Sequence, residues 1–407
     1  MRIATCLCLP LAALALYGQT ASFHEDTLHG RRAFVLENDQ MRVSTLPGGG
    51  FIGEIRFKSA DPKKSVNPMR VPHYQTIDPY SYDIGKHGDL YGTGMQRRLM
   101  SGYMGHFLCF PHFGGSSAAE LALDYGQHGE ALAVEWKREK VDTAKDGVVL
   151  VYGADLPKTQ YRVQRTITLP ANQTVGYIDE SVENLAMFDR PVQWVQHITF
   201  GPPFLELNKT FVDASVSKTL VRAGRGGRGA GGQASAVPAM SEGAWPEAKD
   251  AQGQTIDQRV FSGRGGIWLL DKSQPKVWFT IYNPDYPVLL GYIFPSAQNP
   301  WILDWQENMR TQEKPWDGKV VARAVCIGDS PFAMGLQNAV ETGSALGTPV
   351  FSWVRARERR TQTYAFFLAE IPLGYKGVAG LRIADGKIVI SERETGKTIS
   401  LTSGRTF

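Results

Sequence analysis

The run GVVLVYGADL, residues 147–156, is followed four residues later by YRVQRTITLP, residues 161–170. Both runs are rich in Val, Ile, Leu, Thr and Tyr and are bounded by turn residues, as half-buried β-strands are. Helical periodicity is scarce elsewhere, and comparable runs recur at 32–39, 41–49, 131–141, 193–201, 276–284 and 288–295. We therefore predict an all-β protein, a large antiparallel β-sandwich rather than a fold of alternating strands and helices.

Turn signals and two long polar segments divide this pattern. Asp385-Gly386 and Thr395-Gly396 each join two alternating runs, as hairpin turns do. The polar segment 60–98 is rich in Tyr, His and Asp, so we expect it to cover a site, and 223–257 is predicted to be a Gly-rich insertion. The prediction is a single sandwich domain over residues 23–407, with room for a small β-hairpin module at about 365–407.

The first residues have the layout of a secretory signal peptide. Arg2 precedes an apolar run from Ile3 to Tyr17, and small or polar residues follow it. We predict a signal peptide over residues 1–22 and a periplasmic or secreted mature protein with no further membrane segment. Cys109 and Cys326 would then remain, and we expect buried thiols because both lie in apolar strand-like runs.

Composition and missing motifs narrow the function. The 407 residues carry a net charge of only +4, without a Lys/Arg block interleaved with aromatics, so nucleic acid is not an expected partner. Serine-nucleophile, P-loop and dinucleotide motifs are absent, and no cofactor is expected. Five of the nine tryptophans lie near Pro, Gly or polar clusters, a mixture that suits stacking on sugar rings. The expected partner is a small sugar or an oligosaccharide.

The run PVQWVQHITFGPPF, residues 191–204, contains the first candidate for chemistry. Strand alternation places Val195, His197 and Thr199 on one face and Trp194, Gln196 and Ile198 on the other. The Gly-Pro-Pro that follows would end the strand and leave His197 near a rim. An ordinary core or surface histidine is the competing interpretation.

The run NPWILDWQENMR, residues 299–310, contains the candidate carboxylates. Alternation puts Trp305 and Glu307 on one face, and Asp304 and Arg310 on the other. A carboxylate desolvated beside an indole suits proton transfer. Alternatively, Glu307 pairs with Arg310 or with another exposed cation.

Three histidines fall in one region, in GHFLCFPHFGG (105–115) and YGQHGEALAVEW (125–136). The spacing of His106, His112 and His128 matches no zinc motif, so no metal site is predicted. They are candidates for the lining of a pocket, although His106 and His112 also suit structural roles.

Four stretches together resemble the galactose mutarotase-like, or aldose 1-epimerase, superfamily. They are LENDQMRVSTLPGGGFIGEIRF (36–57), QHGEA (127–131), NLAMFDRPVQWVQHITFGPPF (184–204) and WQENMR (305–310). The resemblance implies a β-supersandwich with His197 as general acid, Glu307 as general base and His128 binding sugar hydroxyls. Arg97 or Arg98 would be the substrate-binding arginine. Apart from the resemblance, His106, Trp305, Asp304 and Arg310 are further candidates for binding the sugar.

The sequence also departs from the family pattern. QHITFGP stands where these enzymes have NHPYFNL, and the usual stretch around the catalytic glutamate is missing, so Glu130 and Asp304 are alternatives to Glu307 as the base. Two other functions stay open on the same fold: a non-catalytic sugar-binding module, and a lyase or hydrolase acting on a modified or oligomeric sugar.

Overall fold

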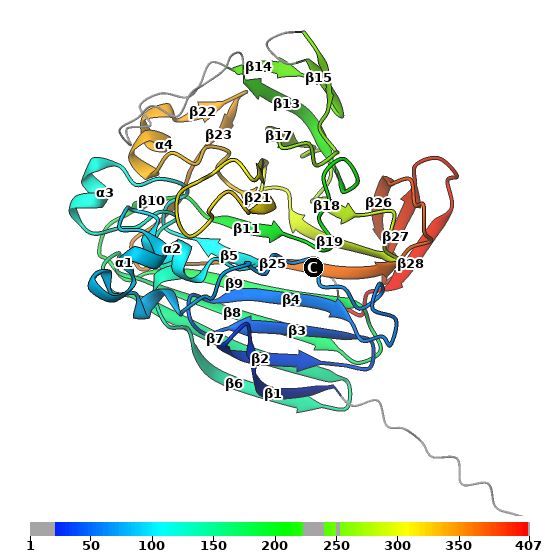
Figure 1. Cartoon of the computed structure of the whole chain (residues 1–407), viewed down its shortest axis with the longest axis horizontal. Helices are drawn as coiled ribbons and strands as arrows, with labels where there is room; N and C mark the ends of the chain where they lie inside the picture. The colour runs from blue at the N-terminus through cyan, green and yellow to red at the C-terminus, as the bar shows by residue number, and fades with distance from the viewer. Residues whose placement is uncertain (1–20, 223–239, 250–252, 406–407) are drawn as a thin grey trace, which may run out of the picture.

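A computed structural model describes residues 21–222, 240–249 and 253–405. Two large antiparallel sheets dominate it, which confirms the predicted all-β sandwich (Figure 1). The first sheet has eleven strands in the order β1-β2-β3-β4-β5-β11-β21-β20-β17-β13-β14. Their bounds are Ser22–Leu28, Arg31–Glu37, Met41–Leu46, Phe51–Phe57, His106–Cys109, Val195–Phe200, Val321–Gly328, Trp301–Asn308, Gly266–Leu270, Val216–Arg222 and Met240–Gly243.

The second sheet has eight strands in the order β12-β18-β19-β25-β9-β8-β7-β6. Their bounds are Phe211–Ala214, Lys276–Tyr282, Val288–Pro295, Arg359–Glu370, Val175–Asn184, Tyr161–Pro170, Gly147–Leu156 and Lys137–Ala144. The two runs that predicted the fold are β7 and β8, which pair in antiparallel register from Gly147–Pro170 to Leu156–Tyr161.

Shorter elements surround the two layers. The helices are α1 (Ile84–Tyr91), α2 (Arg97–Gly102), α3 (Ala118–Ala122) and α4 (Leu336–Thr342), with 3-10 turns η1 (Pro79–Ser81) and η2 (Ala131–Ala133). Three two-stranded pairs are β10 (Arg190–Val192) with β24 (Ser352–Val354), β15 (Glu247–Lys249) with β16 (Thr255–Asp257), and β22 (Ser344–Ala345) with β23 (Thr348–Pro349). Within the described residues, no helix combines the length and apolar character needed to cross a bilayer.

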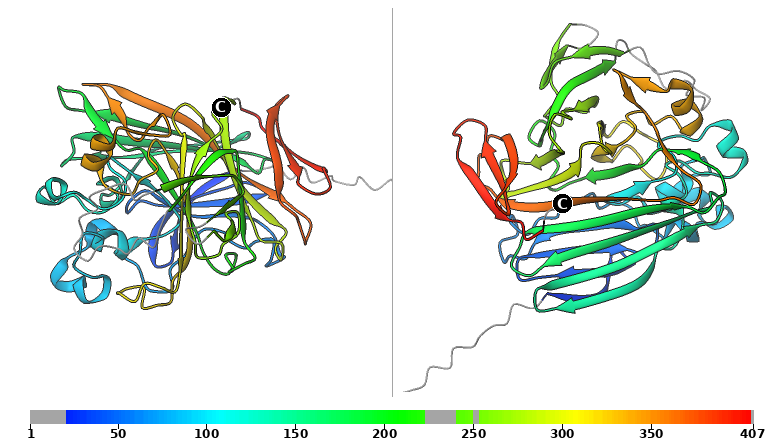
Figure 2. Two further views of the ribbon diagram at one scale, coloured as in Figure 1. Left: turned by 90° about the horizontal axis from the view of Figure 1, so that it is seen from above. Right: turned by 180° about the vertical axis from the view of Figure 1, so that it is seen from behind.

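The C-terminal strands form a small sheet of their own, β26 (Val378–Ala384), β27 (Lys387–Glu392) and β28 (Thr398–Thr402). Both predicted hairpin turns join its strands. Ile388 and Ile390 pack with Tyr177 and Phe367 of the eight-stranded sheet, so this module packs on one part of the outer face of that layer, at one side of the molecule (Figure 2). The module has three strands and begins at Val378, because 365–370 belongs to β25 of the large sheet.

The space between the two large sheets is the main core, and it contains a buried ion pair. The Glu180 carboxylate accepts hydrogen bonds from Nε and Nη2 of Arg165, at 2.9 and 2.6 Å. Both side chains are fully buried. Its other oxygen accepts Trp194 Nε1 at 2.7 Å and Gln196 Nε2 at 2.5 Å. Glu180 of β9 therefore ties one sheet to β11 of the other, next to His197.

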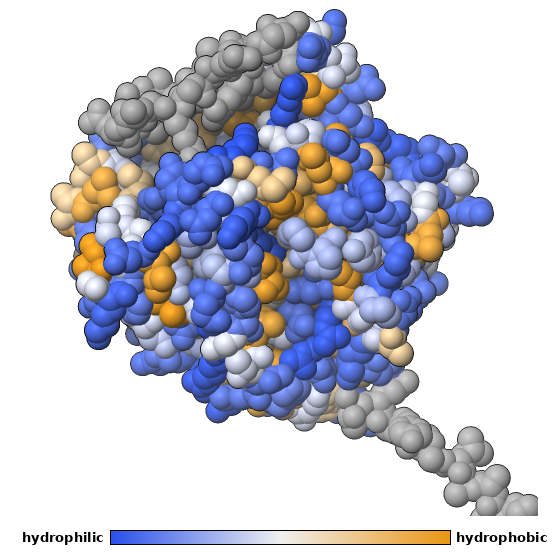
Figure 3. Space-filling view, viewed as in Figure 1, coloured by the Kyte–Doolittle hydropathy of each residue, from blue (hydrophilic) through white to orange (hydrophobic). Residues whose placement is uncertain are grey.

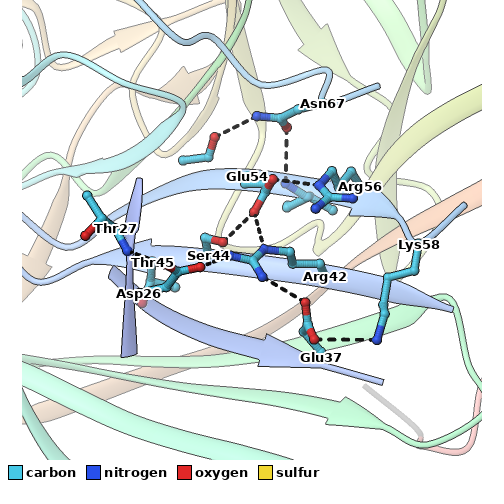
Figure 4. Close-up of polar contacts among 12 residues, drawn as sticks. Asp26, Thr27, Glu37, Arg42, Ser44, Thr45, Glu54, Arg56, Lys58 and Asn67 are labelled. Atoms are coloured by element: carbon cyan, nitrogen blue, oxygen red, sulfur yellow. Dashed lines mark hydrogen bonds and ion pairs between the residues drawn. The ribbon is translucent and has the colours of Figure 1, made fainter. Parts of the chain in front are cut away.

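The outer face of the eleven-stranded sheet has two parts. Over β1 to β4 it carries a charged cluster in which Arg42 binds Asp26, Glu37 and Glu54 at 2.7 to 2.9 Å, while Asn67 holds the backbone of β4 (Figure 4). Around β5, β11 and β21 the same face carries an apolar cluster. The candidate site is a cavity in this apolar part.

The Gly-rich insertion predicted at 223–257 falls largely outside the described residues, which exclude 223–239 and 250–252. Its described flanks form β14 and the β15–β16 hairpin. The predicted signal peptide also lies outside, apart from Ala21 and Ser22. Cys109 and Cys326 are buried free thiols, as expected.

Candidate functional site

A cavity of about 570 Å³ opens on the apolar part of the outer face. Its floor comes from β11 and β21, and its walls come from α2, from β20 and from the loop that joins β20 to β21. Met95 and Gln96 also line it, so the end of the long segment 60–98 reaches this cavity. Figure 3 shows hydrophobic side chains reaching the surface between hydrophilic ones on the face seen in Figure 1.

His197 lies at the floor of this cavity. Alternation along β11 places it on the face opposite Ile198, as predicted, and Ile198 packs in the core between the sheets. Its ring stacks on the Phe107 ring, with centroids 4.5 Å apart. Its Nδ1 lies 3.0 Å from the Thr199 hydroxyl, and that hydroxyl lies 3.1 Å from the Tyr103 hydroxyl. The strand ends at Phe200, before Gly-Pro-Pro, but His197 is only 5% exposed. The expected rim position is wrong, because His197 is the third of the six residues of β11 and lies on the cavity floor.

His128 faces His197 across the floor, with ring centroids 5.1 Å apart and an edge-to-face angle of 78°. Its backbone has φ 66°, and the following Gly129 leaves no room for a side chain, since an added Cβ would lie 2.2 Å from Phe110 O. Nδ1 accepts the Gly114 N–H at 3.2 Å and also contacts Cys109 Sγ. Because that backbone group can only donate, the neutral ring carries its proton on Nε2.

Both imidazoles are neutral at neutral pH. Burial, together with the nearby His106 and Arg70, lowers the pKa of His197 to about 3. Burial also holds the pKa of His128 well below its ordinary value, and His197 adds to the effect. The floor therefore offers hydrogen-bonding groups without charge, which suits an uncharged ligand.

Glu307 shares the outward-facing side of β20 with Trp305 but does not line the cavity. It is 1% exposed, and its carboxylate accepts the N–H groups of Arg310 and Thr311 at 2.7 and 3.2 Å and the Thr311 hydroxyl at 2.8 Å. Arg310 Nε lies 3.8 Å away and its side chain is 60% exposed. The carboxylate therefore holds the first residues of the β20–β21 loop against the end of β20.

That loop brings in a group that the sequence analysis missed. Thr311, Glu313, Lys314 and Trp316 all line the cavity, and Glu313 is the one carboxylate among the described lining residues. The available signal was the order Glu-Lys-Pro-Trp, a carboxylate and a cation beside an indole, directly after the strand that carries Trp305. Trp305 and Trp316 form a pair of indoles with centroids 5.8 Å apart.

The other predicted site residues lie elsewhere. Arg97 and Arg98 bind Asp124 at 2.8 and 3.3 Å and do not line the cavity. Asp304 points into the space between the sheets, as the predicted alternation requires, and pairs there with buried Arg323 at 2.8 Å. Burial raises the pKa of Asp304. These three residues are drawn away from the cavity by partners of opposite charge.

His106 and Glu130 are also engaged elsewhere. His106 belongs to the inner face of β5, with Nε2 2.9 Å from Gln196 Oε1, and burial lowers its pKa to about 3. Glu130 accepts the N–H groups of Lys158 and Thr159 at 3.0 and 2.8 Å. Of His106, His112 and His128, only His128 lines the cavity, so the three histidines do not form one site. The described residues contain no group of three or more His, Cys, Asp or Glu able to hold a metal ion.

Comparison with solved structures identifies the architecture. A candidate aldose 1-epimerase from Klebsiella pneumoniae superposes with a TM-score of 0.56 at 12% identity, over 86% of this chain and 83% of that one. The chain has the galactose mutarotase-like fold. A galactose mutarotase-like protein from Clostridium acetobutylicum (TM-score 0.52, 12% identity, 86% and 99% coverage) and the Slr1438 protein from Synechocystis (0.53, 15%, 86% and 98%) share it.

At these identities the mutarotase-like likeness extends to the fold alone. No protein-family model and no curated protein sequence matches the chain. The resemblance in the sequence and the likeness of the structure agree on the mutarotase-like fold, and the chemistry has to be argued from the cavity.

Proposed function

We propose that this protein binds a sugar in the cavity and interconverts its anomers, in the manner of an aldose 1-epimerase. The observation that carries the proposal is the pair His128 and His197, which face each other at 5.1 Å on the cavity floor. The indoles of Trp305 and Trp316 supply apolar faces on which a sugar ring can stack. The mutarotase-like fold supports the same assignment.

Anomer interconversion needs an acid and a base. One proton leaves the anomeric hydroxyl, another reaches the ring oxygen as the bond from C1 to that oxygen breaks, and closure after rotation about C1–C2 returns both protons. His197 would serve the ring oxygen from the floor. Glu313 would accept the hydroxyl proton, because it lines the cavity whereas Glu307, Asp304 and Glu130 do not.

The neutral state of His197 decides how this pair can act. With a pKa of about 3, His197 is a neutral imidazole at neutral pH and is not a cationic acid. A carboxylate brought close to an imidazole raises its pKa. We infer that sugar binding draws the exposed Glu313 side chain inward and that its charge favours the protonated form of His197.

Saturation-transfer NMR between the anomers of a panel of aldoses tests the proposal. Wild type should accelerate exchange, and His197→Asn and Glu313→Gln should each lower the rate by about 10²–10⁴. The double variant should lose little more than the worse single variant, because the two groups act in one step. Glu130→Gln is the control outside the cavity. Exchange at the wild-type rate in Glu313→Gln would remove Glu313 from the mechanism.

A non-catalytic sugar-binding protein is the second candidate. It is favoured by a specific observation: burial lowers the pKa of His197 to about 3, so the ring on the cavity floor is neutral. In that case sugars bind, as titration calorimetry would show, but no aldose in the panel exchanges its anomers faster than in buffer.

A further inference from the structure

We propose that the cavity prefers 6-deoxy sugars, whose C6 is a methyl group, over the parent hexoses with a hydroxyl there. This inference rests on the proposed function in one respect, the placement of the ring oxygen at His197. It names the class of substrate that the cavity selects.

The lining of the cavity is sorted by depth. Its most buried members are Leu99, Met100, Tyr103, Phe113, Trp316 and Cys326, together with the two histidines of the floor. All six belong to one hydrophobic cluster, against which Leu303 and Trp305 also pack. Glu313 and Lys314 are exposed, and Gln96, Gln127 and Thr311 are partly exposed. Charge therefore gathers at the mouth, and apolar surface gathers at the floor.

Polar groups at depth are few. Tyr103 directs its hydroxyl at Thr199, and His128 Nδ1 is occupied by Gly114. The groups left for a ligand are the His197 ring, His128 Nε2, which also lies 3.3 Å from Gln127 Nε2, and the indole Nε1 of Trp316, a buried donor without a hydrogen-bond partner among the described residues. No Arg, Asp or Asn is among the described lining residues. A hydroxyl buried here beyond the reach of these groups would lose the hydrogen bonds that it makes in water.

The connectivity of a pyranose links the apolar floor to one position of the sugar. The ring oxygen is bonded to C1 on one side and to C5 on the other, and C5 carries C6. If His197 contacts the ring oxygen, C6 lies two bonds from the atom at that contact, and we place it against the apolar floor. Cys326 stands opposite His197 in the β11–β21 pairing, and Phe113 lines the same deep region. A methyl group suits such surroundings better than a hydroxymethyl group does.

Titration calorimetry on matched pairs tests the preference. The pairs are 6-deoxy-D-galactose with D-galactose, 6-deoxy-L-mannose with L-mannose, and 6-deoxy-D-glucose with D-glucose. In at least one pair the 6-deoxy sugar should bind about 10- to 100-fold more tightly, the range that an apolar pocket achieves against an added hydroxyl. Equal binding in every pair, tighter binding of the parents, or no binding by any sugar overturns the inference.

Two methionines provide matched variants. Met100→Gln adds an amide at depth and should reduce the preference at least several-fold, whereas Met187→Gln makes the same change at an exposed position outside the cavity and should leave it unaltered. Met100→Leu keeps the apolar character and should keep the preference, which separates polarity from damage to the fold.

The same pairs, followed by saturation-transfer NMR, separate this inference from the proposed function. Tighter binding of a 6-deoxy sugar without faster anomer exchange would leave the preference standing and refute the epimerase. Faster exchange with equal binding within every pair would support the epimerase and refute the preference for 6-deoxy sugars.

Discussion

The hydroxyl of Thr311 donates a 2.8 Å hydrogen bond to the carboxylate of Glu307, four residues earlier in the chain. The same carboxylate accepts the backbone N–H groups of Arg310 and Thr311. The loop closed in this way carries Glu313 and Trp316 to the cavity. Glu307 thus shapes the wall of the cavity without lining it.

Removing that carboxylate should therefore loosen the loop. We expect Glu307→Ala to lower the free energy of unfolding by about 1–3 kcal/mol, because three donors lose their acceptor. Sugar affinity should fall as well, since Trp316 and Glu313 are no longer held in place. Urea unfolding and titration calorimetry measure the two effects.

Glu392 is the matched control for this variant. Its carboxylate binds the Thr395 hydroxyl and the Lys376 N–H in the C-terminal sheet, which contributes no lining residue to the cavity. Glu392→Ala should lower stability and leave sugar affinity unchanged. A positioning role for Glu307 fails if both variants bind sugar as wild type does.

The buried histidines make stability depend on pH. The pKa of His197 is about 3 in the folded protein, against 6.5 for an ordinary histidine, because burial disfavours the charged ring. Below pH 6.5 the unfolded chain takes up a proton that the folded protein does not bind, so the free energy of unfolding falls as the pH falls toward 3. The loss is up to about 1.4 kcal/mol per pH unit.

His197→Asn removes the contribution of His197 to this pH dependence of the free energy of unfolding. Relative to wild type, its stability should rise by up to about 2 kcal/mol between neutral pH and pH 5, as measured by urea unfolding at each pH. A stability difference that does not vary with pH would contradict the burial of a neutral imidazole at this position.

Asp329 should behave in the opposite sense. Its buried carboxylate accepts the Trp194 N–H and the Ser352 hydroxyl, and burial raises its pKa to about 7 from an ordinary value of 3.8. Between pH 7 and 3.8 the folded protein binds a proton that the unfolded chain does not, so this group adds stability as the pH falls. Asp329→Asn should therefore lose stability relative to wild type on acidification over the same range.

The buried pair of Arg165 and Glu180 should respond very differently to single and double replacement. Glu180→Ala leaves an uncompensated buried charge, and we expect a loss of about 3–5 kcal/mol in the free energy of unfolding. Replacing Arg165 with Met and Glu180 with Leu together should cost much less than the two single changes added. Additive losses in urea unfolding would show that the two side chains are not coupled.

Export is expected from the N-terminal apolar run. Mass spectrometry of the protein purified from its native host should find a mature N-terminus between about residues 20 and 24, as the layout of a signal peptide requires. Intact Met1 on the soluble protein of the cytoplasm would contradict export.

Local patterns predicted the sandwich and the direction of its side chains. The alternation of side chains along residues 195–199 correctly predicted that His197 and Ile198 lie on opposite faces of the strand. The pair Asp385-Gly386 correctly predicted a hairpin turn. Such inferences hold because a strand imposes alternation, and a tight turn imposes its residue types, whatever packs around them. They extended to Asp304, which does lie on the face opposite Trp305.

The choice among the carboxylates was decided only by the tertiary structure. Alternation shows the face toward which Glu307 points, but it cannot show that three donors of the following loop occupy its oxygens. Nor can it show that Glu313, in a loop without periodicity, reaches the cavity. Arg97 and Arg98 were likewise drawn to Asp124, about 26 residues away in the chain. Hydrogen bonds and ion pairs form between whichever groups the folded chain brings together, and that proximity is a property of packing, not of local sequence.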